Sequence, residues 1–226
     1  MIEDRRFFWN GPAGITAFTT TRQDMMPAGD FQEQELRRFL ERFFLTPVSV
    51  TGMKQVHGDR IEAVDRFHTD RVVLECDGLW TSEAQAALTV RSADCLPVIA
   101  FDKVRRKLAV IHAGWRGVKA GILEKMIREM DAVDLTLGIG PAIGRCCYEV
   151  GPEFKSSFAP YLSEKEGRSY FDLKGAAIAQ LIGAGVLPDQ IDVAPWCTAC
   201  ETELCPSFRR DREHTGRMVT VAWINN

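Results

Sequence analysis

The stretch "SADCLPVIAFDKVRRKLAVIHAGWRG", from Ser92 to Gly117, contains two apolar runs separated by a charged segment. Runs of this length and composition predict two buried strands, joined as a hairpin that turns at "KVRR". If Pro97 faces His112 across the hairpin, Cys95 and His112 lie on one face as diagonal neighbours, because side chains alternate along strands. They are then close enough to share a metal ion or a proton. A register shift of one residue would place them on opposite faces.

The rest of the chain alternates between strand and helix patterns. Apolar runs predict strands at "GITAFTTT", "AALTV", "LTLGIG", "IDVAPW" and "RMVTVAWI", and "SVTGMKQVHGDRIEAVD" predicts two short strands around a turn. Helical spacing of apolar residues predicts helices over 31–44, 118–130 and 176–186, with Gly185 closing the last one. Several strands are joined by short turns, which favours an α/β (α+β) fold with a mixed sheet.

The composition is that of a globular protein without a strongly charged face. The 226 residues are 46% hydrophobic and 26% charged, and the net charge is -3. The segment "MIEDRRFFWN" lacks the apolar core of a signal peptide, and no run is long enough for a membrane span. We therefore expect a cytoplasmic monomer that binds neither nucleic acid nor membrane. The seven cysteines should then be mostly reduced, so metal binding or catalysis comes before disulfides.

A third residue can complete a metal site with Cys95 and His112. Among the four histidines, His57 lies in a predicted turn between apolar runs. Zinc accepts two imidazoles and one thiolate and keeps a fourth position for water or substrate. The spacing alone is not diagnostic, and the alternative is two surface histidines with a buried structural thiol.

Basic and aromatic residues follow the second strand of the hairpin. Arg116 precedes a predicted helix, where backbone N–H groups and the helix dipole favour anions. Its guanidinium can bind a phosphate or carboxylate bidentately. Trp115 could stack on a flat ring or belong to the core. Near the C-terminus, Arg209 and Arg210 either form a solvated face or add a second anion clamp.

Three polar residues near the predicted ligands can each be interpreted in more than one way. Asp94 could support its neighbour Cys95 or act as a general base, and equally could cap a turn. Gln55 could bind a base edge or orient His57. Asp77, in "CDGLWT", could contact a ribose hydroxyl or stabilise a turn.

Five cysteines lie between residues 146 and 205. An extended segment would direct Cys146 and Cys147 to opposite sides, with one of them, which we take to be Cys147, facing the site. The stretch "CTACETELC" holds three more cysteines, and His214 lies beyond it. This set could bind a second zinc ion, although its spacing matches no common zinc knuckle. Reduced thiols are the alternative.

Several motifs together resemble one protein family. "KQVHGD", "DGLWT", "SADCLPV", "HAGWRG", "GPAIGRCCYEVG" and "RRDREHTGR" occur in family order from Thr51 to the C-terminus. They resemble the YfiH/YlmD family, also called the polyphenol oxidase or laccase-domain family, which includes the mammalian protein FAMIN. Relatives usually carry an "NLG" segment after "TTR", which "TTTRQDMMPAGDF" lacks, and tend to have an aromatic residue at the position of Cys205. Any substrate contact from the missing segment is therefore in doubt.

The resemblance implies a single domain over residues 1–226, with mixed β-sheets packed between helices and a fold related to that of glutamine-deamidating toxins. It implies a catalytic zinc at His57, Cys95 and His112, and phosphorolysis of adenosine, inosine or methylthioadenosine together with deamination of adenosine. Another family label is peptidoglycan editing factor. We expect catalytic roles for Cys95, His112, Asp94 and Arg116, and substrate contacts from Gln55, Asp77, Arg116, Cys147 and Arg210.

Other functions remain open at this stage. A multicopper oxidase needs more ligands than four histidines supply, but a single copper could occupy the zinc site. A metal-free hydrolase could use Cys95 as nucleophile and His112 as base, which would leave His57 without a role. An amidase acting on peptidoglycan precursors could use the same zinc, and a zinc-binding protein without enzymatic activity is also conceivable.

Overall fold

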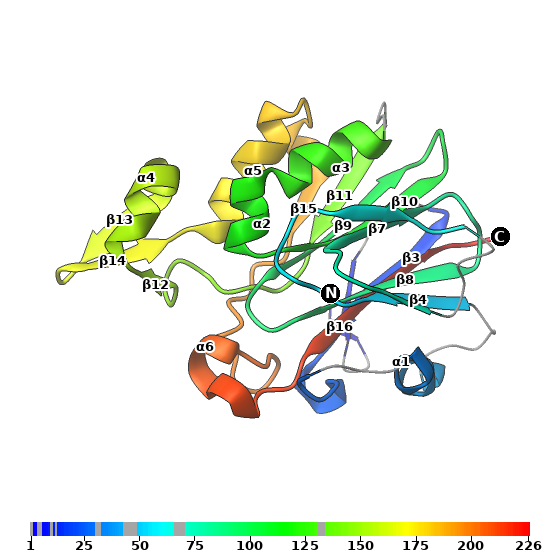
Figure 1. Ribbon diagram of the computed structural model, residues 1–226, viewed down its shortest axis with the longest axis horizontal. Helices are drawn as coiled ribbons and strands as arrows, with labels where there is room; N and C mark the ends of the chain where they lie inside the picture. The colour runs from blue at the N-terminus through cyan, green and yellow to red at the C-terminus, as the bar shows by residue number, and fades with distance from the viewer. Residues whose placement is uncertain are drawn as a thin grey trace.

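Two β-sheets stack face to face, with helices on both outer sides and a small hairpin arm projecting from one end (Figure 1). The computed structural model describes residues 2–3, 6–9, 11, 13–29, 33–42, 49–65, 71–130 and 134–226. None of the helices in these ranges is long and apolar enough to cross a membrane.

The larger sheet has seven strands in the order β1-β2-β3-β16-β8-β4-β6. Strand β4 pairs in parallel with β6 and β8, and the other neighbours are antiparallel. The strands span Ile2–Glu3 (β1), Arg6–Phe8 (β2), Ile15–Thr20 (β3), Ser49–Met53 (β4), Arg71–Val73 (β6), Ala86–Ser92 (β8) and Met218–Ile224 (β16).

The second sheet has six strands in the order β15-β11-β9-β10-β7-β5. Its two edge strands pair in parallel with their neighbours and the inner pairs are antiparallel. The strands span Ile61–Ala63 (β5), Gly78–Thr81 (β7), Leu96–Asp102 (β9), Lys107–Ala113 (β10), Leu135–Ile139 (β11) and Ile191–Val193 (β15). The prediction of mixed sheets is therefore confirmed.

The hairpin of β9 and β10 lies at the centre of the second sheet and has the register expected from the sequence. Asp102 pairs with Lys107 and Pro97 pairs with His112. Both strands are buried on both faces, which explains their nearly continuous apolar runs.

Side-chain alternation in the hairpin builds two core layers. Val98 and Ile111 face outward and pack in the same cluster as the helix residues Ile122 and Met126. Ile99, Phe101, Leu108 and Val110 face inward and pack against Leu88, Val90, Ala222 and Ile224 of the larger sheet. Cys95 and His112 continue the inward-facing series, so the functional residues lie at one end of the layer between the sheets.

The helices cover the outer faces of both sheets (Figure 1). Helix α1 (Glu33–Glu41) packs on the larger sheet through Leu36 and Leu40. Helices α2 (Trp115–Ala120), α3 (Ile122–Met130) and α5 (Leu173–Gly183) cover the second sheet. Of the predicted helix over 31–44, residues 31–32 and 43–44 lie outside the described part of the chain.

The predicted helix over 118–130 is wrong in one respect, because the chain forms two helices there. Gly121 adopts the left-handed conformation at φ +83° and ends α2, and its N–H bonds to the carbonyls of Gly117 and Val118. Apolar residues at helical spacing occur on both sides of Gly121, so the sequence pattern did not reveal the break. Helix α5 ends at Gly183, just before the left-handed Gly185, but begins at Leu173, three residues earlier than the predicted range of 176–186. Its N-cap is Asp172, whose carboxylate accepts from the N–H of Gly175.

The projecting arm is a third sheet of β12 (Glu149–Val150), β13 (Leu162–Lys165) and β14 (Arg168–Phe171), accompanied by α4 (Lys155–Phe158). Phe154, Phe158 and Phe171 pack together at its base. The remaining elements are α6 (Phe208–Asp211) and short 3-10 turns at Arg22–Asp24, Pro152–Phe154, Ala159–Tyr161, Pro188–Gln190 and Arg212–His214.

Candidate metal centre and substrate cavity

Three potential metal ligands meet at the open end of the layer between the two sheets. Cys95 directly precedes β9 and His112 lies near the end of β10. His57 comes from the loop that leaves β4 in the larger sheet and enters β5 in the second sheet. The two strands predicted around His57 are thus present, but they belong to different sheets and carry the loop across the opening.

The three side chains are arranged as a metal site. One ligand atom from each of His57, Cys95 and His112 lies within 4.8 Å of the other two. The imidazole centroids of His57 and His112 are 4.8 Å apart and the rings are nearly perpendicular. His112 is buried, Cys95 is half-buried and His57 is exposed, so the site opens toward solvent on one side.

Asp77 holds both histidines in place from behind. Its Oδ1 lies 2.7 Å from Nδ1 of His112 and accepts a hydrogen bond from the backbone N–H of His57 at 3.0 Å. Its Oδ2 accepts from the N–H groups of Val56 and Gly58. A bond at Nδ1 leaves Nε2 of His112 free to act as a ligand.

Gly114 leaves the space in which the ligands converge. A Cβ at this position would lie 3.0 Å from Sγ of Cys95 and 3.2 Å from Cδ2 of His57. The neighbouring Gly117 serves close packing, because a Cβ there would lie 2.8 Å from the carbonyl oxygen of Gly58. These two glycines of "HAGWRG" therefore have steric roles.

The electrostatics of the site favour a thiolate. Burial raises the pKa of Cys95, but the neighbouring imidazoles of His112 and His57 outweigh it and lower the pKa to about 6. Burial lowers the pKa of His112, whereas the Cys95 thiolate and Asp77 raise it to about 9. A thiolate is the form that binds metals, and it is also the form that acts as a nucleophile.

A cavity of about 510 Å³ lies in front of the three ligands. This volume is within the range of small-molecule sites. Basic side chains dominate its wall, with Asp94 as the carboxylate among the described lining residues. The basic members are Lys54, Arg91, Arg116, Arg209 and Arg217, and the aromatic members are Trp115, Tyr148 and Phe208. The cavity therefore suits an anionic group beside a flat ring.

Arg116 differs from the other arginines of the cavity in its surroundings. It is exposed on α2, and its guanidinium lies 4.5 Å from the ring centroid of Trp115. Helix α2 has only six residues and begins at Trp115, so Arg116 lies inside a short helix rather than ahead of a long one. Its own charge, and not a helix dipole, makes this part of the cavity attractive to anions.

Asp94 supports the wall of the cavity through both carboxylate oxygens. Oδ1 accepts from the hydroxyl of Thr198 at 2.6 Å, and Oδ2 accepts from the N–H of Arg209 at 2.6 Å. Its backbone φ is +94°, a region that residues other than glycine rarely adopt. The backbone carbonyl accepts from the N–H of Ile143. Asp94 thus fixes two loops beside Cys95.

Several predicted substrate contacts lie elsewhere. Asp77 is fully buried behind the histidines, so the expected ribose contact is wrong and the residue positions ligands instead. Gln55 does line the cavity, but its amide donates to the carbonyl of Arg91 and accepts from the N–H of the same residue. It therefore fixes the start of the His57 loop, and no bond from its amide to His57 is present among the described contacts.

Arg210 points away from the cavity. Its guanidinium donates to the carbonyls of Thr198, Ala199 and Cys205 and pairs with Asp211. The adjacent Arg209 faces the cavity instead, with its guanidinium 5.1 Å from the ring centroid of Tyr148. Of the two arginines in "FRRD", Arg209 and not the predicted Arg210 therefore lines the cavity.

The expectation that Cys147 faces the site is also wrong. Cys146 and Cys147 lie in a turn, and both approach Cys200 on the far side of the loop. Cys205 and His214 are not part of that group in the described structure. Cys205 is buried in a core cluster with Phe7 and Met218, and His214 is exposed.

Sequence reasoning missed Tyr148 and the aromatic Phe208 as members of the cavity wall. Tyr148 follows the two cysteines of "GRCCYEVG", so a close reading of that motif could have selected it. Burial raises the pKa of Tyr148, and the negative charge of Cys95 adds to the effect. Its hydroxyl therefore remains a hydrogen-bond donor at neutral pH.

The residues fit a zinc ion better than several coppers. Two imidazoles and a thiolate, with a carboxylate behind one imidazole, are the ligands and support that zinc prefers in catalytic sites. Several copper ions would need many histidine ligands. In the described ranges, His57 and His112 are the only histidines that belong to a cluster of possible metal ligands. His68 lies outside those ranges, and His214 is exposed and outside both ligand clusters.

The fold and the site together define a protein of mixed α/β architecture with a candidate His/Cys metal site. Residues 29–225 match the sequence model of the family described as multicopper polyphenol oxidoreductase laccase. The chain belongs to this family, as its resemblance to YfiH and YlmD predicted.

Several relatives are named purine nucleoside phosphorylase. One from Aquifex aeolicus is 39% identical over 166 residues, covering 68% of this chain and 78% of the relative. The YlmD phosphorylase of Geobacillus stearothermophilus is 38% identical over 190 residues, covering 74% of this chain and 69% of the relative. The match to the Aquifex aeolicus relative supports membership of the family independently, because 39% identity extends over 68% of this chain and 78% of the relative.

Solved structures share the whole fold. The crystal structure of YlmD from Geobacillus stearothermophilus superposes with a TM-score of 0.87 at 31% identity, covering 100% of this chain and 98% of that one. A Bacillus licheniformis protein described as hypothetical protein YfiH gives a TM-score of 0.84 at 28% identity, covering 96% of this chain and 99% of that one. The predicted fold class is confirmed.

Proposed function

We propose that this protein is a zinc-dependent purine nucleoside phosphorylase whose zinc is held by His57, Cys95 and His112. The observation that carries the proposal is the position of this ligand set at the floor of a cavity lined by arginines and aromatic rings. The names of the relatives point the same way. The substrates are a purine nucleoside and inorganic phosphate.

The basic side chains account for the phosphate. Arg116 and Arg209 lie on the cavity wall, and a guanidinium binds phosphate oxygens through paired hydrogen bonds. Neither guanidinium has an ion pair with a carboxylate among the described contacts, so both can accept an anionic ligand. Arg116 is the best-placed holder of phosphate because it is exposed and its side chain is braced by the Trp115 ring.

The aromatic residues account for the nucleoside. Trp115 and Tyr148 both line the cavity, and flat rings stack favourably on a purine. The Tyr148 ring is fixed against Phe154 and Phe171 at the base of the projecting arm. Its protonated hydroxyl can donate a hydrogen bond to the purine as negative charge develops on the leaving base.

Phosphorolysis needs charge stabilisation at both ends of the reacting system. A phosphate oxygen bonds to C1′ while the C1′–N9 bond breaks, and the purine leaves with the bonding electrons and takes up a proton. The products are ribose 1-phosphate and the free base. Arginines orient and neutralise the phosphate, and Tyr148 supports the departing base. A zinc ion bound at the three ligands would supply a Lewis acid that polarises an oxygen of the nucleophile.

Deamination of adenosine has less support from this cavity. That reaction needs an acid–base group near the purine, and the carboxylate of Asp94 already accepts two hydrogen bonds at 2.6 Å. Phosphorolysis is therefore the reaction we propose, and formation of inosine from adenosine in the assay below would indicate deamination. A metal-free Cys95–His112 nucleophile pair is the principal alternative, because their pKa values favour a thiolate beside an imidazolium.

The test is incubation of the purified protein with adenosine, with and without phosphate, and separation of the products. The proposal expects adenine and ribose 1-phosphate only when phosphate is present. It expects full loss of activity after zinc is removed by a chelator, and recovery when zinc is returned. Activity that survives complete zinc removal would support the cysteine nucleophile and refute the metal mechanism.

One substitution separates the two mechanisms further. His57→Ala removes a metal ligand but leaves Cys95 and His112 in place, so we expect activity to fall at least ~100-fold if the metal is needed. If Cys95 is the nucleophile instead, we expect only the smaller loss that follows from removing one of the two imidazoles that lower its pKa. His214→Ala is the matched control, since His214 is exposed and does not line the cavity. Unchanged activity of His57→Ala would contradict the proposal.

A further inference from the structure

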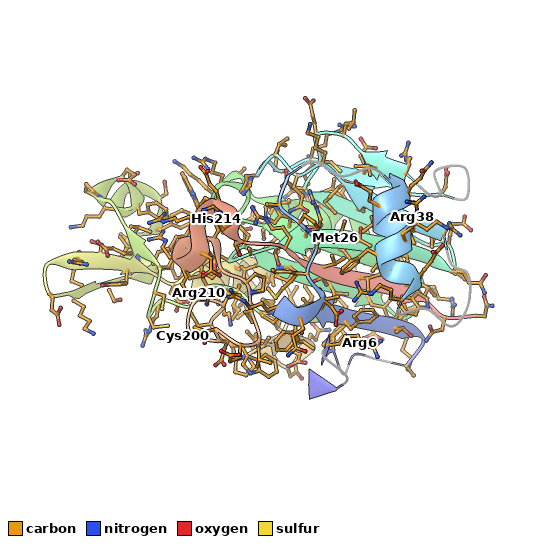
Figure 2. All side chains as sticks on the ribbon, turned by 90° about the horizontal axis from the view of Figure 1, so that it is seen from below. Arg6, Met26, Arg38, Cys200, Arg210 and His214 are labelled. Carbon is orange, nitrogen blue, oxygen red and sulfur yellow. The ribbon has the colours of Figure 1, made fainter. Side chains whose placement is uncertain are left out.

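A second cluster of thiols lies behind the cavity wall, separate from the three ligands described above. One sulfur from each of Cys146, Cys147, Cys197 and Cys200 lies within 4.8 Å of the other three. Sγ of Cys200 is 3.4 Å from that of Cys147 and 3.6 Å from that of Cys146. In Figure 2 the labelled Cys200 and Arg210 lie on the C-terminal segment near the base of the projecting arm.

Backbone contacts bring the two cysteine-bearing loops together. Ala142 forms a parallel bridge with Cys197, and the N–H of Thr198 donates to the carbonyl of Ala142. The N–H of Gly144 donates to Sγ of Cys197 at 3.1 Å. A Cβ at Gly144 would lie 3.2 Å from Sγ of Cys146 and 3.4 Å from Sγ of Cys197, so glycine permits this approach.

The segment "CTAC" folds as a tight turn of the kind that binds zinc. The N–H groups of Cys200 and Glu201 both donate to the carbonyl of Cys197. The N–H of Gly144, described above, is a backbone donor aimed at Sγ of Cys197. Backbone donors directed at a sulfur stabilise the thiolate that a metal requires.

We propose that Cys146, Cys147, Cys197 and Cys200 bind a second zinc ion through four thiolates. A tetrahedral zinc site with Zn–S bonds of about 2.3 Å places its sulfurs about 3.8 Å apart. The two measured separations, 3.4 and 3.6 Å, and the 4.8 Å limit on all pairs allow this geometry after small side-chain adjustments. The inference does not depend on the proposed catalytic activity.

A disulfide accounts for the cluster less well than a metal. Cys200 is close to both Cys146 and Cys147, and one disulfide could use only one of these two contacts, whereas a metal ion uses both. The structure joins none of the seven cysteines, which all lie in the described ranges, in a disulfide. Lys174 lies beside the cluster, because its ammonium donates to the carbonyl of Trp196 next to Cys197. A nearby positive charge suits four thiolates around a divalent ion, which carry a net negative charge.

The second ion would stabilise the wall of the substrate cavity. Thr198 lies between the two cysteines of "CTAC", and its hydroxyl donates to Asp94 beside Cys95. Tyr148 follows Cys147 directly and lines the cavity. Joining the two loops through a metal therefore fixes two groups that surround the reacting atoms. Its role is structural, because none of its four ligands lines the cavity in the described structure.

Metal content measured by inductively coupled plasma mass spectrometry tests the inference on the full chain. If both sites bind zinc, we expect about two equivalents per chain, with about one lost in Cys200→Ser and in Cys146→Ser, and the other lost in His57→Ala. Cys205→Ser is the matched control, because this cysteine lies in a separate core cluster and should not change the zinc content. If the catalytic site holds no zinc, the wild type has about one equivalent, and Cys200→Ser still removes it.

Cobalt substitution in the wild-type protein gives a measurement that needs no variant. Four thiolates should give intense sulfur-to-cobalt charge-transfer bands and the visible spectrum of tetrahedral cobalt. Zinc content that is unchanged in both serine variants would overturn the inference. So would loss of two free thiols in the denatured wild-type protein, which would indicate a disulfide, or iron in place of zinc at these cysteines.

Discussion

The carboxylate of Asp77 connects the two histidines of the metal centre through a 2.7 Å contact with Nδ1 of His112. The same oxygen accepts the N–H of His57, and the other oxygen accepts the N–H groups of Val56 and Gly58. One buried side chain thus sets the ring orientation of one ligand and the loop conformation of the other. His57 has a φ of +62°, which this set of bonds maintains.

We expect Asp77→Asn to weaken zinc binding at His57, Cys95 and His112 by ~10–100-fold. An asparagine keeps the shape of the side chain but replaces one acceptor oxygen with an NH2 group. This group cannot accept a hydrogen bond from the backbone N–H groups or from the imidazole N–H that it would face, so those contacts would be lost. Competition with a chromophoric chelator measures the affinity. Asp189→Asn, at an exposed position, is the control. Equal affinity in Asp77→Asn and the wild type would show that the carboxylate does not tune the ligand.

Gly114→Ala should disturb the same centre by steric means. The added Cβ would lie 3.0 Å from Sγ of Cys95 and 3.2 Å from Cδ2 of His57, so both ligands must shift by a few tenths of an ångström. The backbone conformation, φ -76° and ψ 168°, accepts alanine. We expect a folded protein by circular dichroism that binds zinc at least ~10-fold more weakly.

The same change at Gly183 controls for the loss of glycine itself. A Cβ at Gly183 meets nothing within 4 Å, and alanine is favoured over glycine in a helix by about 0.5–1 kcal/mol. Gly183→Ala should therefore keep its zinc affinity. If the two variants bind zinc equally well, the steric account of Gly114 is wrong.

The hairpin of β9 and β10 could be predicted from the sequence because the features that define it lie close together in the chain. Alternation of side chains and a short charged turn fix the register of β9 and β10, and the register places Cys95 and His112 together. The role of Asp77 depends on pairing between β7 and β10 and on a loop from the other sheet. The partners in both contacts are distant from Asp77 in the sequence. The residues around Asp77 therefore suggested only a turn or a substrate contact.

The thiol cluster shows the same limit. Its four cysteines come from two loops about fifty residues apart, and tertiary contacts such as the bridge between Ala142 and Cys197 bring them together. Spacing along the chain grouped Cys205 with Cys197 and Cys200 instead. The helix break at Gly121 was missed for a different reason, because the apolar spacing continues on both sides of the left-handed residue.

Asp211 provides a stability prediction that depends on pH. Its carboxylate bonds to the guanidinium of Arg210 at 2.7 and 2.8 Å and to that of Arg22 at 3.0 Å, and these contacts lower its pKa below the ordinary 3.8. A lowered pKa in the folded state adds stability above the unfolded value, and this stability is lost as the pH falls through the folded value.

We therefore expect Asp211→Asn to lower the free energy of unfolding by about 1 kcal/mol at pH 7. The difference from the wild type should shrink as the pH falls below about 4, because the wild-type carboxyl then becomes protonated too. Urea unfolding at several pH values measures both quantities. A difference that stays constant from pH 7 to pH 3 would mean that the ionised carboxylate is not its source.

Arg116→Ala should identify the phosphate-binding group of the cavity. The Arg116 guanidinium lies over the Trp115 ring, and within the described chain it has no hydrogen bond or ion pair with a protein group. A charge-assisted hydrogen bond contributes about 1.5–3 kcal/mol, so its loss should reduce kcat/KM for phosphate by ~10–100-fold. The effect should reside mainly in the KM for phosphate, with a smaller change in the KM for adenosine.

Two variants complete the Arg116 experiment. Arg116→Lys keeps the charge but cannot bind two oxygens with a planar group, so it should recover only part of the lost activity. Arg128→Ala, at an exposed position on α3 outside the cavity, should behave as the wild type. If Arg116→Ala leaves the phosphate dependence unchanged while adenosine binding weakens, Arg116 contacts the nucleoside, and Arg209 becomes the group that must hold the phosphate.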